Sequence, residues 1–177
     1  MTSMGSEIAS FYIQPKIGCD IQVLSAIAKK VIENQEEDEV FIQNFTSGFE
    51  AYRACLEQMN FNQLCKESGV AEQELNEVAT LYGNAKNVVF TWAMGITHHT
   101  HGVENVEAIA NLAMLRGMIG RPNAGLLPLR GHSNVQGVGS VGVSPTLKQS
   151  IFENIESQLQ IALPKSPGWD TMACMRQ

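Results

Sequence analysis

Residues Val88–Met94 read VVFTWAM, and this run decides the fold class of the chain. A continuous stretch of β-branched and aromatic residues is typical of a parallel strand that is covered on both faces. Gly95 ends the run and the loop ITHHTHG follows. Apolar residues at helical spacing then predict a helix over Val103–Arg116, with Gly117 at its carboxyl end. Strand, loop and helix in this order favour an α/β layer arrangement.

The chain before this strand reads mostly as helices. Phe11–Ile13 is a short apolar run closed by Pro15 and Gly18, and it predicts the end of a strand. Asp20 is predicted to cap a helix that runs through Val31. Further segments are predicted as a solvated acidic run at 36–39, helices over 40–45, 49–59 and 72–82, and a short turn ending at Gly69.

A glycine-rich stretch, Pro128–Pro145, reads PLRGHSNVQGVGSVGVSP, and GVGSVG within it has the G-x-G-x-x-G spacing of a dinucleotide-binding motif. That motif needs a buried strand before its first glycine and a helix that opens on its last. Residues 130–136 are too polar for such a strand, and the helix start at Ser144 and Pro145 comes after the last glycine. We therefore interpret the glycines as a loop that lies flat against another surface, followed by a helix over 145–159.

The composition is that of an ordinary soluble globular protein. The 177 residues are 44% hydrophobic and 17% charged. A net charge of -6 without a basic stripe argues against a nucleic-acid surface, and no apolar run indicates a membrane span. Four scattered cysteines without C-x-x-C pairing predict reduced thiols in the cytoplasm. Residues 1–10 read as a leader or an expression remnant, and residues 11–177 as a single α/β unit.

All histidines of the chain lie between the end of the predicted strand and the glycine-rich stretch: His98, His99, His101 and His132. Ligands of open α/β sheets gather beyond the carboxyl ends of the strands. One hypothesis is a metal site built from His98, His99 and His101, although two adjacent histidines rarely face one ion. A second is a group of hydrogen-bonding side chains around a large polar ligand. The simplest alternative is that each histidine only makes local hydrogen bonds in its loop.

Arg130 allows a similar pair of interpretations. An arginine beside a glycine is usually a surface or structural residue, and Arg130 precedes Gly131. The glycine permits close approach of a ligand, and Asn134 and Gln136 add amide donors and acceptors nearby. A guanidinium in this setting is suited to holding an anionic substrate or a phosphate in bidentate fashion.

Longer segments resemble a known family. WAMGITHHTHGVENVEAIANLAMLRGMIGRPNAGLLPLRGHSNVQGVGSVG closely resembles the large subunits of molybdopterin oxidoreductases, specifically formate dehydrogenase alpha subunits and their relatives. KIGCD, VFIQNFTSGFEAYRA, SGVAEQEL and LPKSPGWDTMACM are similar to the same family in the same order, so nearly the whole chain after the first ten residues is covered. The resemblance implies a helix-rich, partial doubly wound (Rossmann-like) layer with short parallel strands, incomplete relative to the family.

The same resemblance implies a cofactor and a set of site residues. In the family, two molybdopterin guanine dinucleotides hold molybdenum or tungsten, and the arginine of the RGxxNVQG loop faces the metal centre beside the substrate. That arginine is Arg130, whose implied role is to orient a substrate carboxylate. The implied cofactor-binding residues come from three segments, a turn near a guanosine, the strand-end loop along a pterin, and the arginine loop: Gly18, Asp20, Met94, Gly95, His98, Gly131, His132 and Asn134.

Departures from the family pattern limit what this chain is expected to do. The family's iron-sulfur cysteine motif, its metal-ligating cysteine or selenocysteine, and its carboxyl-terminal cofactor domain have no counterpart in the sequence. The chain therefore resembles an internal piece of a larger enzyme that oxidises formate or a similar small substrate. Alone it is expected to be inactive, with or without bound cofactor, and its partner would be the remainder of the enzyme. The alternatives are a remnant that self-associates through unpaired sheet edges, and a small protein that binds metal through the histidine loop.

Overall fold

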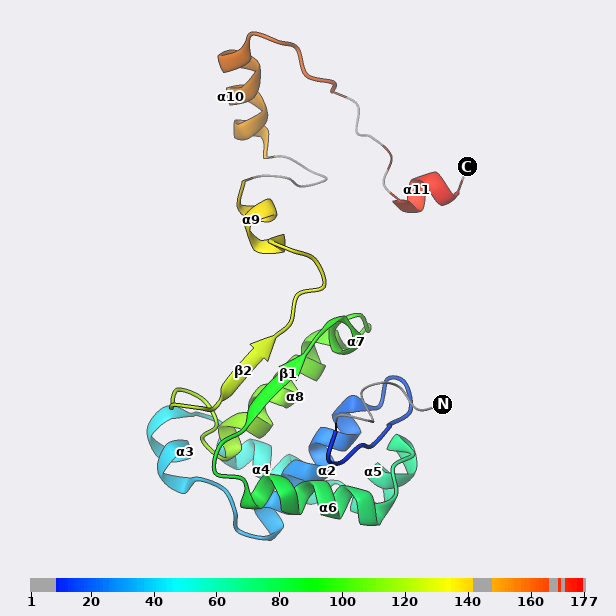
Figure 1. Cartoon of the computed structure of the whole chain (residues 1–177), viewed down its shortest axis with the longest axis vertical. Helices are drawn as coiled ribbons and strands as arrows, with labels where there is room; N and C mark the ends of the chain where they lie inside the picture. The colour runs from blue at the N-terminus through cyan, green and yellow to red at the C-terminus, as the bar shows by residue number, and fades with distance from the viewer. Residues whose placement is uncertain (1–8, 142–147, 166–168, 170, 177) are drawn as a thin grey trace. The chain divides into compact units, whose positions relative to one another are not determined.

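Helix α2 (Asp20–Glu33) organises the first of two units into which the chain divides, Met1–Gly131 and His132–Gln177. The computed structural model describes residues 9–141, 148–165, 169 and 171–176 (Figure 1). Because its small apolar residues Ala26 and Ala28 have no exposed surface, neighbouring helices pack closely around α2. The helices in contact with it are α4 (Phe49–Gln58), α5 (Phe61–Ser68), α6 (Glu72–Asn84) and α8 (Gly102–Leu115).

The amino end of α2 differs from the prediction. Cys19 is the N-cap residue and Asp20 is the first helical residue, without a side-chain capping hydrogen bond, so the predicted capping role of Asp20 is wrong. A carboxylate in the first turn still interacts favourably with the helix dipole. The strand predicted at Phe11–Ile13 is also wrong, because residues 9–19 contain no strand. The segment is fixed instead by the Lys16 N–H, which donates to the carbonyl of Ser68 at 2.8 Å.

Local capping explains where the next helices begin and end. Helix α3 (Glu39–Phe45) begins at Asp38, whose carboxylate accepts a hydrogen bond from the Phe41 N–H at 2.9 Å. Helix α5 begins at Asn60, whose side chain accepts from the Gln63 N–H, and it ends at Gly69, which has a φ of 73°. The helices predicted at 40–45, 49–59 and 72–82 are confirmed to within a few residues.

The acidic run at 36–39 is not the solvated loop that was expected. Only 6% of the Glu37 side chain is exposed, and its carboxylate pairs with the Arg53 guanidinium at 3.1 Å. Glu36 and Asp38 are half-buried, while Glu39 is exposed. Glu37 can be buried because Arg53, from the different helix α4, supplies the opposite charge that a buried carboxylate needs.

Two short parallel strands form the sheet of the described residues. Strand β1 (Val89–Trp92) pairs with β2 (Gly125–Pro128), with Val89 opposite Gly125 and Trp92 opposite Pro128. Together with the helices they confirm the predicted helix-rich α/β class. The strand β2 was not predicted.

Strand β1 is shorter and less covered than predicted. On its inner face Phe90 packs edge-on against Tyr82, with ring centroids 5.6 Å apart. On its outer face 51% of Val89 is exposed. The expectation that both faces are covered is therefore wrong for the described part of the chain. The last residue of the predicted strand, Met94, begins the short helix α7 (Met94–Thr97) instead.

Arg116, at the end of α8, joins three segments of the first unit. Its guanidinium donates to the backbone carbonyls of Glu36 at 3.1 Å, Ala85 at 3.0 Å, and Tyr82. The Tyr82 hydroxyl in turn donates to the carbonyl of Leu112 in α8 at 2.7 Å. Gly117, with a φ of 59°, follows the helix end as predicted.

The second unit contains α9 (Val135–Ser140), α10 (Gln149–Leu159) and α11 (Thr171–Met175). Residues of GVGSVG belong to α9, so the flat loop expected there is wrong for 135–140. The predicted helix start at Ser144 and Pro145 lies outside the described residues, and α10 begins at Gln149. Within the described residues, no helix has the length and apolar character needed to cross a membrane.

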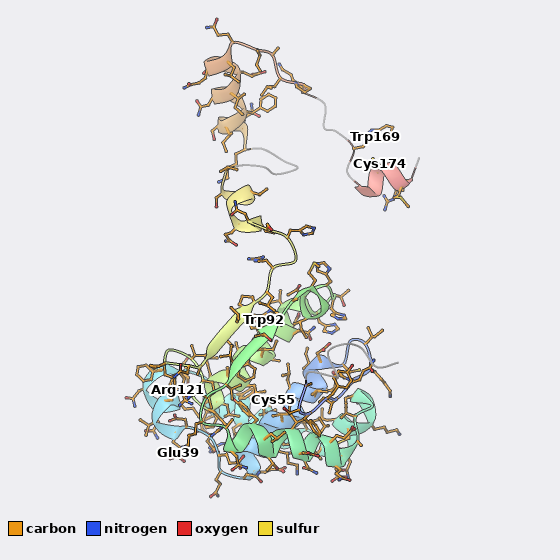
Figure 2. All side chains as sticks on the ribbon, in the orientation of Figure 1. Glu39, Cys55, Trp92, Arg121, Trp169 and Cys174 are labelled. Atoms are coloured by element: carbon orange, nitrogen blue, oxygen red, sulfur yellow. The ribbon has the colours of Figure 1, made fainter. Side chains whose placement is uncertain are left out.

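All four cysteines have free thiols. Figure 2 shows Cys55 on α4 and Cys174 on α11, both of which are exposed.

Candidate functional site

The carboxyl ends of β1 and β2 lie at the same edge of the sheet because the strands are parallel. The Leu129 N–H donates to the Trp92 carbonyl at 2.7 Å, which extends the pairing past the last residues of both strands. The chain segments that leave this edge are Met94–His101 and Leu129–Gly131. We call them together the strand-end surface.

Met94 and Gly131 bring the two segments of the strand-end surface into contact. A Cβ atom added to Gly131 would come within 2.8 Å of Met94 Cε, so only glycine allows the methionine to lie this close to the loop backbone. Met94 nevertheless remains 44% exposed. Beside it, a Cβ on Gly95 would have no atom within 4 Å, so the space next to this backbone is open. Two residues distant in sequence thus share one exposed backbone surface.

The histidines of the loop have separate roles in the structure. The His98 N–H closes α7 by donating to the Met94 carbonyl at 2.9 Å, and its side chain is exposed. The His99 ring is hydrogen-bonded through Nε2 to the Gly95 carbonyl, also at 2.9 Å. His99 therefore holds the loop back against the end of β1.

His101 connects this loop to the amino-terminal turn. Its ring stacks on that of His99, with centroids 5.2 Å apart and an interplanar angle of 25°. Its Nε2 atom is buried and has no hydrogen-bond partner among the described residues. A Cβ on Gly18, which has a φ of 82°, would lie 3.7 Å from His101 Cε1. The turn at Gly18 therefore packs beside the histidine loop.

The metal-site hypothesis for the histidine loop is not supported by this geometry. Among the residues that the structure describes, no group of three or more His, Cys, Asp or Glu side chains is placed to hold one ion. The rings of His99 and His101 stack face to face, so their nitrogen lone pairs do not converge on one point. The residues are instead tied to backbone and to each other.

The remaining predicted site residues fall into two groups. Arg130 is exposed and follows directly on β2, within the strand-end surface. Asp20 lies in the first turn of α2, two residues after Gly18. His132 and Asn134 belong to the second unit, where both are exposed and Asn134 is the N-cap of α9 with a φ of 54°. Gly18, Met94, Gly95, Arg130 and Gly131 therefore all lie in the first unit, together with the histidine loop. His132 and Asn134 lie in the second unit.

One residue that fixes the segment after β1 was not predicted from the sequence. Asn105 is fully buried in α8, and its amide donates to the Ile96 carbonyl at 2.9 Å. A polar residue within an apolar helical stripe is the signal that could have identified it, because a buried amide requires a partner. The second missed feature is the contact between His101 and the Gly18 turn, for which the sequence carries no local signal.

Comparison with known proteins places the chain in a family. Residues 2–163 match the family model described as molybdopterin oxidoreductase. Formate dehydrogenase H of Escherichia coli (strain K12) is 37% identical over 140 residues, which cover 79% of this chain and 20% of that protein. An uncharacterized oxidoreductase of Mycobacterium tuberculosis (strain H37Rv) is 32% identical over 178 residues, which cover 97% of this chain and 23% of that protein.

A solved structure agrees at the level of fold. Acetylene hydratase from Pelobacter acetylenicus matches with a TM-score of 0.65 and 16% identity, over 68% of this chain and 17% of that one. The chain thus spans about a fifth of the length of these relatives. With nearly all of its residues matched by the family model, the chain belongs to the molybdopterin oxidoreductase family.

Proposed function

We propose that the strand-end surface contacts the molybdopterin cofactor of a formate-dehydrogenase-like oxidoreductase, and that this chain forms part of that enzyme's cofactor-binding region. The observation that carries the proposal is the packing of Gly131 against Met94, because it unites two sequence-distant segments on one exposed surface. The family match and the 37% identity to formate dehydrogenase H support the assignment. The cofactor would be a molybdopterin guanine dinucleotide with molybdenum or tungsten.

The residues present fit such a cofactor. A flat, anionic, hydrogen-bonding ligand needs backbone that it can approach closely, and the open space beside Gly95 and the exposed Gly131 provide it. The buried, unpartnered Nε2 of His101 is a hydrogen-bonding group that nothing in the described chain satisfies. The turn at Gly18 packs beside this ring, and the carboxylate of Asp20, two residues further on, would accept N–H donors of the guanine end.

Arg130 is the proposed substrate-orienting residue. When bound, the cofactor would supply the two-electron oxidation of formate or a similar small substrate. The guanidinium presents a planar set of donors that matches a carboxylate. Its position is defined because the preceding residue, Leu129, is hydrogen-bonded to the end of β1 at 2.7 Å. His98 is proposed as a further polar contact to the cofactor.

The experiment is to express the chain in a host that makes the cofactor and to measure molybdenum, tungsten and oxidised-pterin fluorescence per purified chain. Gly131→Leu is expected to lower pterin occupancy at least fivefold, because the new side chain displaces Met94 and covers the backbone. The matched control is Gly48→Asn at a turn with a φ of 78° and no atom within 4 Å of an added Cβ, which is expected to leave occupancy unchanged. Equal occupancy in both variants would contradict the proposal.

Activity and location follow as two further expectations. We expect the isolated chain to show no formate oxidation, and turnover by the pure chain would contradict that expectation. We also propose that the enzyme acts in the cytoplasm. The free thiols of Cys19, Cys55, Cys65 and Cys174 support a reducing compartment.

A further inference from the structure

Helix α8 begins with two buried residues on one face. Gly102 is its first residue and Asn105 lies three positions later, a spacing that places both on the same side of the helix. Both are buried, whereas Val103 and Glu104 between them are exposed. The short helix α7 packs against α8 (Figure 1), and the contacts below show that it does so on the face formed by Gly102 and Asn105.

Gly102 allows the backbone of α7 to lie close to α8. A Cβ atom added to Gly102 would overlap the carbonyl group of Thr97, the last residue of α7. The overlap is with backbone and not with the end of a flexible side chain, so α7 would have to move away to relieve it. Glycine at this position is therefore needed for the observed separation of the two helices.

Two side chains hold consecutive peptide groups of α7. The Asn105 amide donates to the Ile96 carbonyl at 2.9 Å, and the His99 ring is hydrogen-bonded to the Gly95 carbonyl at the same distance. Because a peptide group is planar, fixing its carbonyl also fixes the direction of its N–H. The backbone that follows Gly95, a residue with unusual conformational freedom, is therefore held in one conformation.

We propose that Asn105 is a positioning residue for the cofactor, which acts through the Ile96 carbonyl to hold the Gly95 backbone ready for binding, while Gly102 sets the distance of α7 from α8. This inference rests on the proposed function, in which Gly95 contacts the cofactor. Asn105 is itself fully buried, so its contribution is preorganisation. The backbone at Gly95 loses its conformational freedom when the chain folds and not when the cofactor binds, which favours binding.

The chemistry of Asn105 allows positioning to be separated from stability. Its Oδ1 atom is buried and has no hydrogen-bond partner among the described residues. A buried polar atom without a partner lowers stability, and leucine has nearly the shape of asparagine without the polar atoms. Asn105→Leu therefore removes this unfavourable group together with the bond to Ile96. Because the two effects oppose each other, the midpoint of urea unfolding is expected to change little.

The test compares Asn105→Leu with the wild type in two measurements. In the cofactor-free chain, amide exchange by NMR is expected to be at least threefold faster at Ile96 and His98, whose N–H groups donate to the Ala93 and Met94 carbonyls. In the chain purified from a host that makes the cofactor, pterin occupancy is expected to fall at least threefold.

Asn111→Leu is the matched control, because it makes the same chemical change on the same helix. Asn111 is half-buried, and its side chain makes no hydrogen bond within the part of the chain that the structure describes. We expect it to leave both amide exchange in α7 and pterin occupancy unchanged. Gly102→Ala is a second variant, which favours the helix by propensity but pushes Thr97 away, and it is expected to lower occupancy as Asn105→Leu does.

The outcomes distinguish this inference from the proposed function. Normal pterin occupancy in folded Asn105→Leu, or unchanged exchange of the α7 amides, would overturn the inference and leave the proposed function intact. An equal loss of pterin in Asn111→Leu would also overturn it. If Asn105→Leu does not fold, normal occupancy in Gly102→Ala overturns the inference instead. A wild-type chain that carries no pterin would contradict the proposed function, and this inference with it.

Discussion

The helices around α2 and the strand-end surface differ in how deeply their side chains are buried. Ala26, Val31 and Leu75 are completely buried, and the Tyr82 hydroxyl of α6 donates a hydrogen bond to the Leu112 carbonyl of α8. At the strand-end surface Met94 is 44% exposed and Leu129 51% exposed. Burial makes the first region the source of stability, and we propose that the second supplies exposed backbone and charge for binding the cofactor. Substitutions should therefore separate the two properties.

The largest expected effect is on the buried region. Leu75→Ala removes a side chain with no exposed surface and leaves a cavity in α6, so it should lower the free energy of unfolding by about 2–5 kcal/mol. Urea denaturation measures the loss, and pterin retention is measured on the folded protein. Unchanged pterin retention would show that the buried helices stabilise the chain without taking part in cofactor binding. Loss of pterin by folded Leu75→Ala protein would contradict the claim that stability and cofactor binding reside in different regions.

Arg116→Met should have the second-largest effect on the free energy of unfolding. The guanidinium satisfies the carbonyls of Glu36, Tyr82 and Ala85, and its removal leaves partly buried acceptors without partners. We expect a loss of about 2–3 kcal/mol in the free energy of unfolding, measured by urea denaturation. Arg176→Met, in the second unit, is the control, because Arg176 is exposed and should change stability by less than about 0.5 kcal/mol. A loss of similar size in both variants would contradict the assigned role of Arg116.

Alkaline pH should also weaken the buried region. Burial raises the pKa of Tyr52 to about 12 and raises that of Tyr82 still more strongly, with the nearby Arg116 charge partly opposing the rise in Tyr82. Each tyrosine keeps its proton in the folded chain after the unfolded chain has lost it. The contribution of the two tyrosines to stability is therefore complete below about pH 10 and falls as pH rises above it, by at most about 1.4 kcal/mol per pH unit for each tyrosine.

Urea denaturation between pH 9 and 11 measures this effect. Tyr52→Phe should flatten the pH dependence relative to the wild type, whatever its effect on stability at pH 8. An unchanged slope would show that Tyr52 is not the group responsible.

The smallest expected effect on stability lies at the strand-end surface. His101→Phe keeps the stacked ring beside His99 and removes the buried Nε2. Because that nitrogen has no partner in the described chain, the free energy of unfolding should change by less than about 0.5 kcal/mol. Pterin occupancy should nevertheless fall severalfold. A large loss of stability with normal pterin occupancy would show that His101 stabilises the fold and does not take part in cofactor binding.

The helices expected at 20–31, 40–45, 49–59, 72–82 and 103–116 could be predicted from sequence because their signals are local, whereas α5 was predicted only as a short turn ending at Gly69, and α7 and α9 were not predicted. Apolar spacing in α2, α6 and α8 sets which face is buried, and Asn60, Gly69 and Gly117 mark helix ends by their side-chain or backbone chemistry. The short strand β2 could not be predicted, because four residues ending in proline carry little pattern. The burial of Glu37 depends on Arg53, which a different helix supplies.

The candidate site was predictable only in part. The position of Gly95 and of the histidine loop after a strand indicated a ligand-binding end, since strands deliver their following loops to one edge. The contact of Met94 with Gly131, and that of His101 with the Gly18 turn, depend on how β1, β2 and α8 pack. Periodicity within one element does not encode such contacts. The N-cap of α2 fell one residue before Asp20, which shows the same limit on a smaller scale.

The most direct measurement of the central claim is hydrogen exchange of the chain with and without bound molybdopterin cofactor. We expect new protection of the amides in Gly95–His101 and Leu129–Gly131, with exchange in α2 and α6 unchanged. Protection confined to another surface, such as the cavity of about 410 Å³ lined by Thr46–Ala51, would contradict the account. So would cofactor binding that leaves the strand-end amides exchanging as they do in the free chain.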